Sequence, residues 1–428
     1  MTATAISLLV FLSLFAPPLI SIALRANNYS FLVATINGYA LTLALILFIV
    51  ALVKSDGRFS INHLKRILTS LIHDKGLLLL VLLFVWIAVS SLANPDPAVA
   101  LLGSVEDYSD AGLFYLAVLG IATFTYLETK KNPRVHSYLL LTVLFGGFIL
   151  ALLAVYETFT GRALLFEATP RQLPLVLFPG KGHLAGFMLM PIAAALAHLN
   201  IWTLGALFLF SFVIGNTYNR SSWIGEALVT LGAYFGKKQW LVVGLTLAIG
   251  LFAGLYSVRT ILPGGGERVL SNPITIEARY YYWLSAARGI MERPLFGWGG
   301  GAYYMHWAKF LSEDELRAFF EKHGLRLIAP GQLFFLVERP DGEKVLQRIT
   351  GWKAHNQFLD VALMWGFPGL LIYISLLIML IKPFFRGDPA AVAVVAYHAF
   401  LMFWFMPAQA AIPLWALWAA ALARAEES

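Results

Sequence analysis

Long apolar runs recur along almost the whole chain, and they constrain its fold more than any other feature. Each has about 17–25 residues, enough for a helix to cross roughly 30 Å of hydrocarbon. Of the 428 residues, 59% are hydrophobic and only 13% are charged, whereas a soluble domain carries about a quarter charged residues. Because helices satisfy their own backbone hydrogen bonds in lipid, we expect an all-α polytopic membrane protein.

The apolar runs predict about twelve transmembrane helices. Only prolines separate the last two, so eleven is the alternative. The expected spans are 4–24, 30–53, 76–93, 108–127, 137–160, 182–199, 201–218, 220–235, 239–258, 356–381, 389–407 and 408–424. The chain then divides into helices one to nine (1–258), a large polar segment (259–355) and helices ten to twelve (356–428).

Lysine and arginine gather on one side of the predicted membrane. They follow the second, fourth, eighth, tenth and twelfth spans, and such a bias marks cytoplasmic loops. Both termini are therefore expected in the cytoplasm and the segment 259–355 on the outer side. The net charge of +7 mostly reflects these loops, so we expect no nucleic-acid partner.

The outer segment is expected to be structured. A glycine-rich stretch at 263–266 leaves the membrane, and helices are predicted at 277–293 and 303–323, with a turn at 294–301 between them. Strands at 334–338 and 344–349 flank Pro340-Asp341-Gly342, which predicts a hairpin.

Several basic residues lie at the outer face, where the bias says they should be rare. For Arg25, Arg162 and Arg171 we expect a guanidinium that reaches the lipid headgroups. Arg220 differs, because it lies in a short turn before Ser221-Ser222 and a helix N-terminus, which together make an anion site. On local features alone, Arg279 fits either role.

His355 lies where the outer segment returns to the membrane, and Asn356 can cap the helix that follows. The positive end of that helix should keep the imidazole neutral, so that it can accept a proton from a hydroxyl. The alternative is an interfacial histidine that only forms hydrogen bonds. His183, after Lys181, opens the sixth span in a similar setting.

Metal and cofactor chemistry have little support in the sequence. Cysteine is absent, which excludes thiolate ligands and a cysteine nucleophile. Acidic pairs are scarce at the outer face, and there is no nucleotide-binding glycine loop, no Gly-x-Ser-x-Gly elbow and no His-Glu-x-x-His. We therefore expect neither a metal nor a cofactor.

Several motifs taken together resemble the O-antigen ligase / O-antigen polymerase superfamily. The pattern includes a large outer loop before the tenth span, and the resemblance covers roughly residues 180–375. The matching stretches are Gly182–Gly186, Asn219–Trp223, Arg279–Trp283, Glu292–Gly299, Ala354–Leu359 and Gly366–Leu371. One departure is Lys181, where the family often has asparagine.

The resemblance implies a GT-C-like glycosyltransferase in the bacterial inner membrane, with its active site facing the periplasm. Such an enzyme transfers a glycan from undecaprenyl diphosphate to an acceptor hydroxyl, with inversion and without metal. His355 would be the base, and Arg220 and Arg279 would bind and stabilise the leaving diphosphate. Further substrate-binding candidates are Lys181, His183, Arg288 and Asn356.

The expected partners are the undecaprenyl-diphosphate-linked donor, a lipid A–core or related lipid-linked acceptor, and membrane lipids. A polymerase, whose acceptor is another carrier-linked glycan, shares the same motifs and stays an alternative. A transporter of an anionic lipid-linked substrate is a second alternative, but transporters place their site near the bilayer midplane between two matching halves. Here the basic residues of the candidate site, among them Arg220 and Arg279, cluster at the predicted outer face rather than at the midplane.

Overall fold

A computed structural model describes residues 3–26, 28–54, 73–103, 110–168, 172–261, 273–331, 334–348 and 353–426. Three features predicted above lie outside these ranges. They are the body of the basic linker after the second span, Arg171, and the glycine-rich stretch 263–266.

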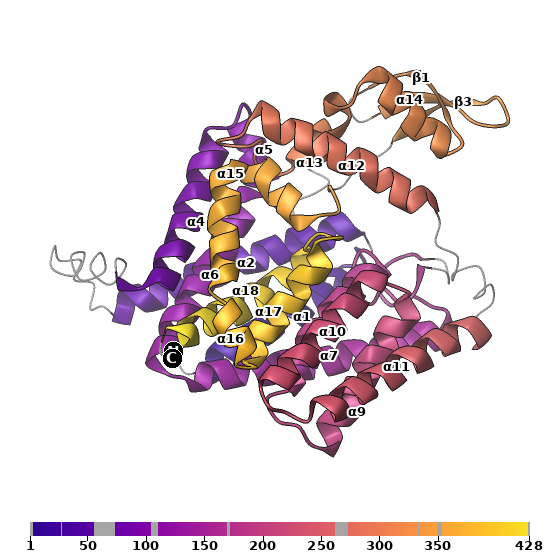
Figure 1. Cartoon of the computed structure of the whole chain (residues 1–428). Helices are drawn as coiled ribbons and strands as arrows, with labels where there is room; N and C mark the ends of the chain where they lie inside the picture. Colours follow the sequence, from indigo (N-terminus) through magenta and orange to yellow (C-terminus); the bar gives the residue numbers. More distant parts are fainter. Residues whose placement is uncertain are drawn as a thin grey trace.

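Most of the described chain is helical (Figure 1). In chain order, the elements before the outer segment are α1 (Ala3–Ala23), α2 (Tyr29–Lys54), α4 (Lys75–Leu92), α5 (Pro97–Leu102), α6 (Gly112–Lys131), α7 (Arg134–Thr160), α8 (Lys181–Ala195), α9 (Ile201–Thr217), α10 (Arg220–Phe235) and α11 (Trp240–Ile261). The later ones are α12 (Pro273–Glu292), α13 (Ala302–His306), the 3₁₀ helix η4 (Trp307–Phe310), α14 (Glu313–Lys322), β1 (Arg326–Ala329), β2 (Phe334–Glu338), β3 (Lys344–Arg348), α15 (Gln357–Ile378), α16 (Ile381–Phe385), α17 (Pro389–Leu401) and α18 (Ala408–Ala425).

Seven helices in the described part of the chain are long and apolar enough to cross a membrane. They are α1, α2, α4, α6, α7, α11 and α15 together with α16. Two shorter apolar helices are α9 and α17. The predicted spans at 182–199, 220–235 and 408–424 form helices too, but these are shorter or less apolar. The all-α membrane character is confirmed at this level, while the number of twelve spans stays a prediction.

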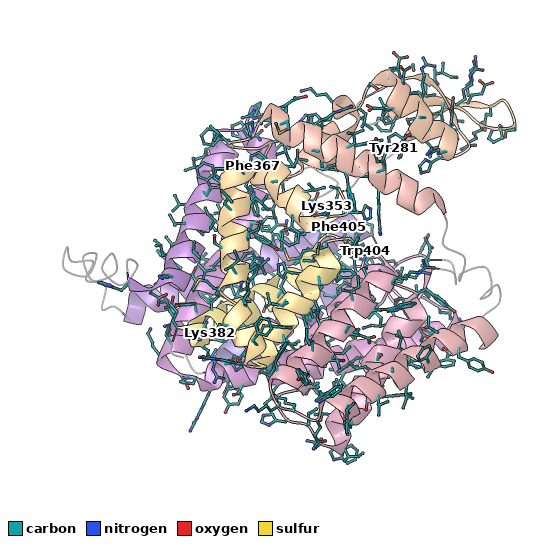
Figure 2. All side chains as sticks on the ribbon, in the orientation of Figure 1. Tyr281, Lys353, Phe367, Lys382, Trp404 and Phe405 are labelled. Atoms are coloured by element: carbon teal, nitrogen blue, oxygen red, sulfur yellow. The ribbon has the colours of Figure 1, made fainter. Side chains whose placement is uncertain are left out.

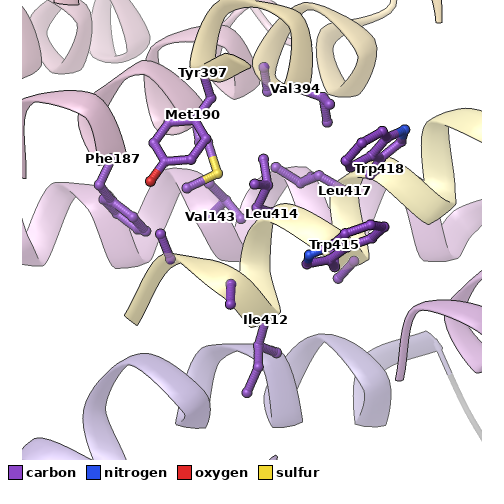
Figure 3. Packing of buried hydrophobic residues seen from close by; sticks show 14 of the residues in the cluster. Val143, Phe187, Met190, Val394, Tyr397, Ile412, Leu414, Trp415, Leu417 and Trp418 are labelled. Carbon is purple, nitrogen blue, oxygen red and sulfur yellow. The ribbon is translucent and has the colours of Figure 1, made fainter. Parts of the chain in front are cut away.

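The bundle core is built around α18, the C-terminal helix. It packs against α6, α17, α1, α7 and α2, and its side chains from Ala408 to Ala423 are buried. Trp415 and Trp418 stack at 4.6 Å between ring centroids, and Figure 3 shows them beside Leu414 and Leu417 in this core. α18 is buried on every side, so neighbouring helices must approach it closely. Its many alanines are small enough to allow that approach.

Residues 259–355 are called the outer segment after the predicted topology. Their described part, shown in orange above the bundle in Figure 1, contains the predicted hairpin. β2 and β3 pair antiparallel as expected, but β1 adds a third strand that the prediction missed. The predicted helix at 303–323 was wrong, since α13, η4 and α14 replace it. Ser312 and Glu315 form a capping box that starts α14 as a new helix.

A break in α15 joins the bundle to the outer segment. Gly366 leaves the helical conformation with φ 70° and ψ −178°, so neighbouring carbonyls lose their helical partners. The backbone N–H groups of Trp298 and Gly299 donate to Leu363 and Met364 at 2.8 and 2.9 Å, and Phe367 donates to Pro294 at 2.7 Å. The motif 292–299 is thus fixed by hydrogen bonds to the first half of α15, which begins just after His355.

Replacing Gly366 with alanine is expected to destabilise this junction strongly. A Cβ there would lie 2.0 Å from the Leu295 carbonyl oxygen, and the backbone conformation alone costs a non-glycine residue roughly 1–3 kcal/mol. Thermal unfolding of the purified protein measures the loss. Gly38→Ala is the matched control, because a Cβ on that helical glycine meets nothing within 4 Å. Equal melting of both variants would show that the junction is not a fixed structure.

Candidate active site

Two aromatic rings lie at the centre of the candidate site. α17 ends at Leu401 and α18 begins at Ala408, and the non-helical stretch between them carries Trp404 and Phe405. Figure 2 shows both rings close to Lys353, at the junction of the bundle with the outer segment. The prediction placed 402–407 inside a span, but Pro407 stands before the first turn of α18 and the helix is interrupted there.

His355 packs on these two rings. Its ring centroid lies 5.6 Å from that of Trp404 and 5.3 Å from that of Phe405, and it stacks on Tyr282 of α12 at 5.8 Å. The histidine backbone is left-handed, with φ +53°, a conformation uncommon for residues other than glycine. Asn356 caps α15 as predicted, accepting hydrogen bonds from the N–H groups of Phe358 and Leu359.

The imidazole of His355 is held in its neutral form. Burial, and to a lesser degree the positive charge of Arg279, lower its pKa to about 4. The direction matches the prediction, and burial and a neighbouring cation are its causes. Nδ1 is enclosed and has no hydrogen-bond partner among the described residues. A neutral imidazole with a free nitrogen can accept a proton.

We therefore expect the imidazole signal of His355 in an NMR titration to change with a midpoint near pH 4. In the denatured chain the midpoint should return to about 6.5. Since the unfolded chain binds a proton between these values and the folded chain does not, the free energy of unfolding should fall as pH is lowered through this window. The variant His355→Gln identifies the signal, and a native midpoint near 6.5 would contradict the enclosed site.

Arg279 lies beside His355 on the same tryptophan. Its guanidinium carbon is 5.8 Å from the Trp404 ring centroid, and Tyr282 stands one turn along α12 on the same face. Within the described ranges the side chain makes no hydrogen bond or ion pair, and its Nε is enclosed. Burial lowers the pKa of this guanidinium, yet arginine remains a cation at any physiological pH. A partly buried cation without an anionic partner favours an anion as ligand.

His183 joins the same cluster from α8. Its ring lies 4.9 Å from Trp404 and 4.5 Å from Phe405 between centroids, and the side chain is buried. The glycine before it, Gly182, allows this approach, since a Cβ there would lie 2.4 Å from the Trp404 ring. The structure thus brings two predicted histidines and one predicted arginine around one aromatic pair.

Arg220 adjoins the cluster without contacting it. It is the first residue of α10, and Asn219 before it caps the helix. The Asn219 amide lies beside Gly182, because a Cβ on that glycine would be 2.6 Å from Nδ2. The arginine side chain is exposed. No hydrogen bond or ion pair joins it to another described residue. Arg220 thus lies at the N-terminus of α10 with an exposed side chain, and the anion site there stays a prediction.

The remaining candidates divide between two places. Lys181 is the first residue of α8, half-buried and two residues before His183. Arg288 instead pairs with Glu315 of α14 through both of its terminal nitrogens, and it lowers the pKa of that carboxyl group to about 2. The Arg288 guanidinium is therefore already paired within the outer segment, and we assign this residue a structural role.

The prediction missed four residues of this site: Tyr282, Lys353, Trp404 and Phe405. The only signal for the last two was the aromatic run that precedes Pro407, a helix-breaking residue. Tyr282 lay within a motif that had been noted for its arginine alone. Lys353 stood two residues before His355 in an outer loop, where nothing distinguished it from a solvated lysine.

No protein-family model matches the chain, and no curated protein or solved structure matches it either. Its chemistry must be inferred from its own residues.

Proposed function

We propose that this chain is a metal-independent, inverting glycosyltransferase. It moves a glycan from undecaprenyl diphosphate to an acceptor hydroxyl, such as one on lipid A–core. The observation that carries the proposal is the pairing of a neutral His355 with an unpaired Arg279 around Trp404. One group can take a proton, and the other can hold a leaving anion.

In the proposed step, the acceptor oxygen attacks the anomeric carbon of the donor glycan while His355 takes the hydroxyl proton. The bond between the anomeric carbon and the diphosphate oxygen breaks, and its electron pair leaves with the diphosphate. Attack from the face opposite the leaving group inverts the configuration. The products are the glycosylated acceptor, undecaprenyl diphosphate and a protonated histidine, which returns its proton to water.

Arg279 supports this step through the charge on the leaving group. The diphosphate gains negative charge as the bond breaks, and a guanidinium that is already in place stabilises that charge without reorganising. The enclosed setting strengthens the interaction, since fewer water molecules screen it. Arg220, at the adjacent N-terminus of α10, would add a second cation when the carrier lipid binds.

The proposal includes the finer topology. About twelve spans would place both termini in the cytoplasm and the cluster at the periplasmic face of the bacterial inner membrane. The lysine and arginine bias of the predicted loops supports this orientation, and the contact between α12 and α15 keeps the outer segment next to the bundle.

The test is a reconstitution in proteoliposomes with undecaprenyl-diphosphate-linked glycan, with and without lipid A–core. We expect glycan on the acceptor and an equal amount of undecaprenyl diphosphate, both dependent on acceptor. A ladder of lengthened carrier-linked glycan from donor alone would make the protein a polymerase. Movement of intact donor across the bilayer, with no bond broken, would make it a transporter and overturn the proposal.

A further inference from the structure

We propose that the ion pair between Lys353 and Asp110 is a positioning device for His355. The inference rests on the proposed function, since it assigns the pair a part in the same reaction. The pair is nevertheless a feature of the structure by itself, and it can be tested without transfer activity.

The two charges are deeply buried. Lys353 Nζ is paired with Asp110 Oδ1, and the side chains are 2% and 4% exposed. They lie 243 residues apart in sequence. Asp110 stands just before α6, and Lys353 stands two residues before His355, so the bond ties the end of the outer segment to the bundle.

The aspartate end of the pair is itself fixed. Its backbone carbonyl oxygen lies so close to Gly300 that a Cβ there would be 1.9 Å away. Gly300 follows Trp298 and Gly299, whose N–H groups bond to the carbonyls of α15. The carboxylate therefore occupies one place relative to the helix that His355 precedes.

The lysine end leads directly to the reacting histidine. Lys353 Nζ lies 5.3 Å from the Phe405 ring centroid, and that ring lies 5.3 Å from the His355 ring. The next residue is fixed as well, because Ala354 N–H donates to Asp360 Oδ1 at 2.9 Å. Two successive residues are thus anchored by carboxylates, and the third, His355, takes the left-handed conformation.

Stability alone does not account for such a pair. Removing two charges from water is costly, and well-packed apolar residues of similar volume often stabilise a fold as well as a buried pair does. An ion pair also fixes the position of the backbone near His355. Apolar side chains would specify that position less well. The conformation of His355 is uncommon and persists only where its surroundings impose it.

The experiment compares Lys353→Met, Asp110→Leu and the double variant. Each single variant takes the ion-pair partner from one buried charge, so both should lose folded protein. The double variant removes both charges and should fold. We expect its kcat to fall about 100-fold, the cost of a small misplacement of a catalytic group, with the donor KM little changed.

A second readout follows the histidine directly. Diethyl pyrocarbonate modifies accessible imidazole, and mass spectrometry reports the rate at His355. We expect faster modification in the double variant and in Asp110→Asn, which removes the charge but keeps the shape. The matched control is Lys130→Met with Glu426→Gln, a pair that ties α6 to the C-terminal end of the chain at 3.2 Å and should leave both readouts unchanged.

The two readouts together either support or overturn the positioning role of the ion pair. A folded double variant with full kcat and wild-type modification would show that the pair only stabilises the fold, and it would overturn the inference. If the double variant does not fold, the modification rate in the folded fraction of Asp110→Asn decides in the same way, because the new amide oxygen can still accept a hydrogen bond from Lys353. Should the wild-type protein transfer no glycan, that rate still tests the positioning of His355, so the two proposals can fail separately.

Discussion

Replacing His355 with alanine is expected to lower kcat by about 100- to 10,000-fold, the range of a lost general base. The substitution removes the neutral nitrogen that accepts the acceptor proton. It leaves the donor's diphosphate contacts in place, so the donor affinity should stay close to that of the wild type. Steady-state transfer to lipid A–core measures kcat, and equilibrium binding of the donor in detergent measures the affinity.

The matched control for this substitution is His323→Ala. His323 is exposed at the end of α14, with its ring packed on Phe319, so its loss should leave transfer unchanged. His323→Ala should melt near the wild-type temperature, whereas His355→Ala should melt somewhat lower because its ring packs on Trp404 and Phe405; transfer is therefore compared at a temperature where both are folded. Full transfer by His355→Ala would remove the assignment of the base.

Replacing Arg279 with lysine is expected to lower kcat by about 100- to 1,000-fold, as the loss of one preorganised donor does elsewhere. Lysine keeps the positive charge but presents a point ammonium, which cannot grip a diphosphate with two parallel N–H groups. It also stacks less well on the indole of Trp404 than a planar guanidinium does. Donor affinity should fall together with kcat, in contrast to the histidine variant.

Arg326→Lys serves as the control for that substitution. Arg326 lies on β1, and its side chain is 77% exposed in an ion pair with Glu338, so the exchange should change neither affinity nor rate. Unchanged donor affinity in Arg279→Lys would argue against a contact with the diphosphate.

Much of the helical framework could be predicted from the sequence, because the length of an apolar run is a local property of the chain. Each of the twelve predicted spans contains a helix, and the strands around Pro340-Asp341-Gly342 form the expected hairpin. One error was avoidable. The helix predicted at 303–323 ignored the Ser312–Glu315 capping pattern, which is visible in the sequence.

Only some residues of the candidate site could be predicted, and how they come together could not. His355, Arg279 and His183 were found from motifs, but their common surface, Trp404 and Phe405, comes from a break between α17 and α18. No periodicity shows which distant segments meet at such a break. The pairing of Lys353 with Asp110 could not be predicted either, because it depends on how the outer segment packs against the bundle.

Cryo-electron microscopy of the protein with a non-hydrolysable undecaprenyl-diphosphate glycan would locate the diphosphate itself. We expect its oxygens at about 2.7–2.9 Å from the guanidinium nitrogens of Arg279, with the anomeric carbon facing the side of Trp404 that carries His355. Diphosphate density elsewhere, with Arg279 and His355 still packed on an unoccupied Trp404, would contradict the proposed chemistry.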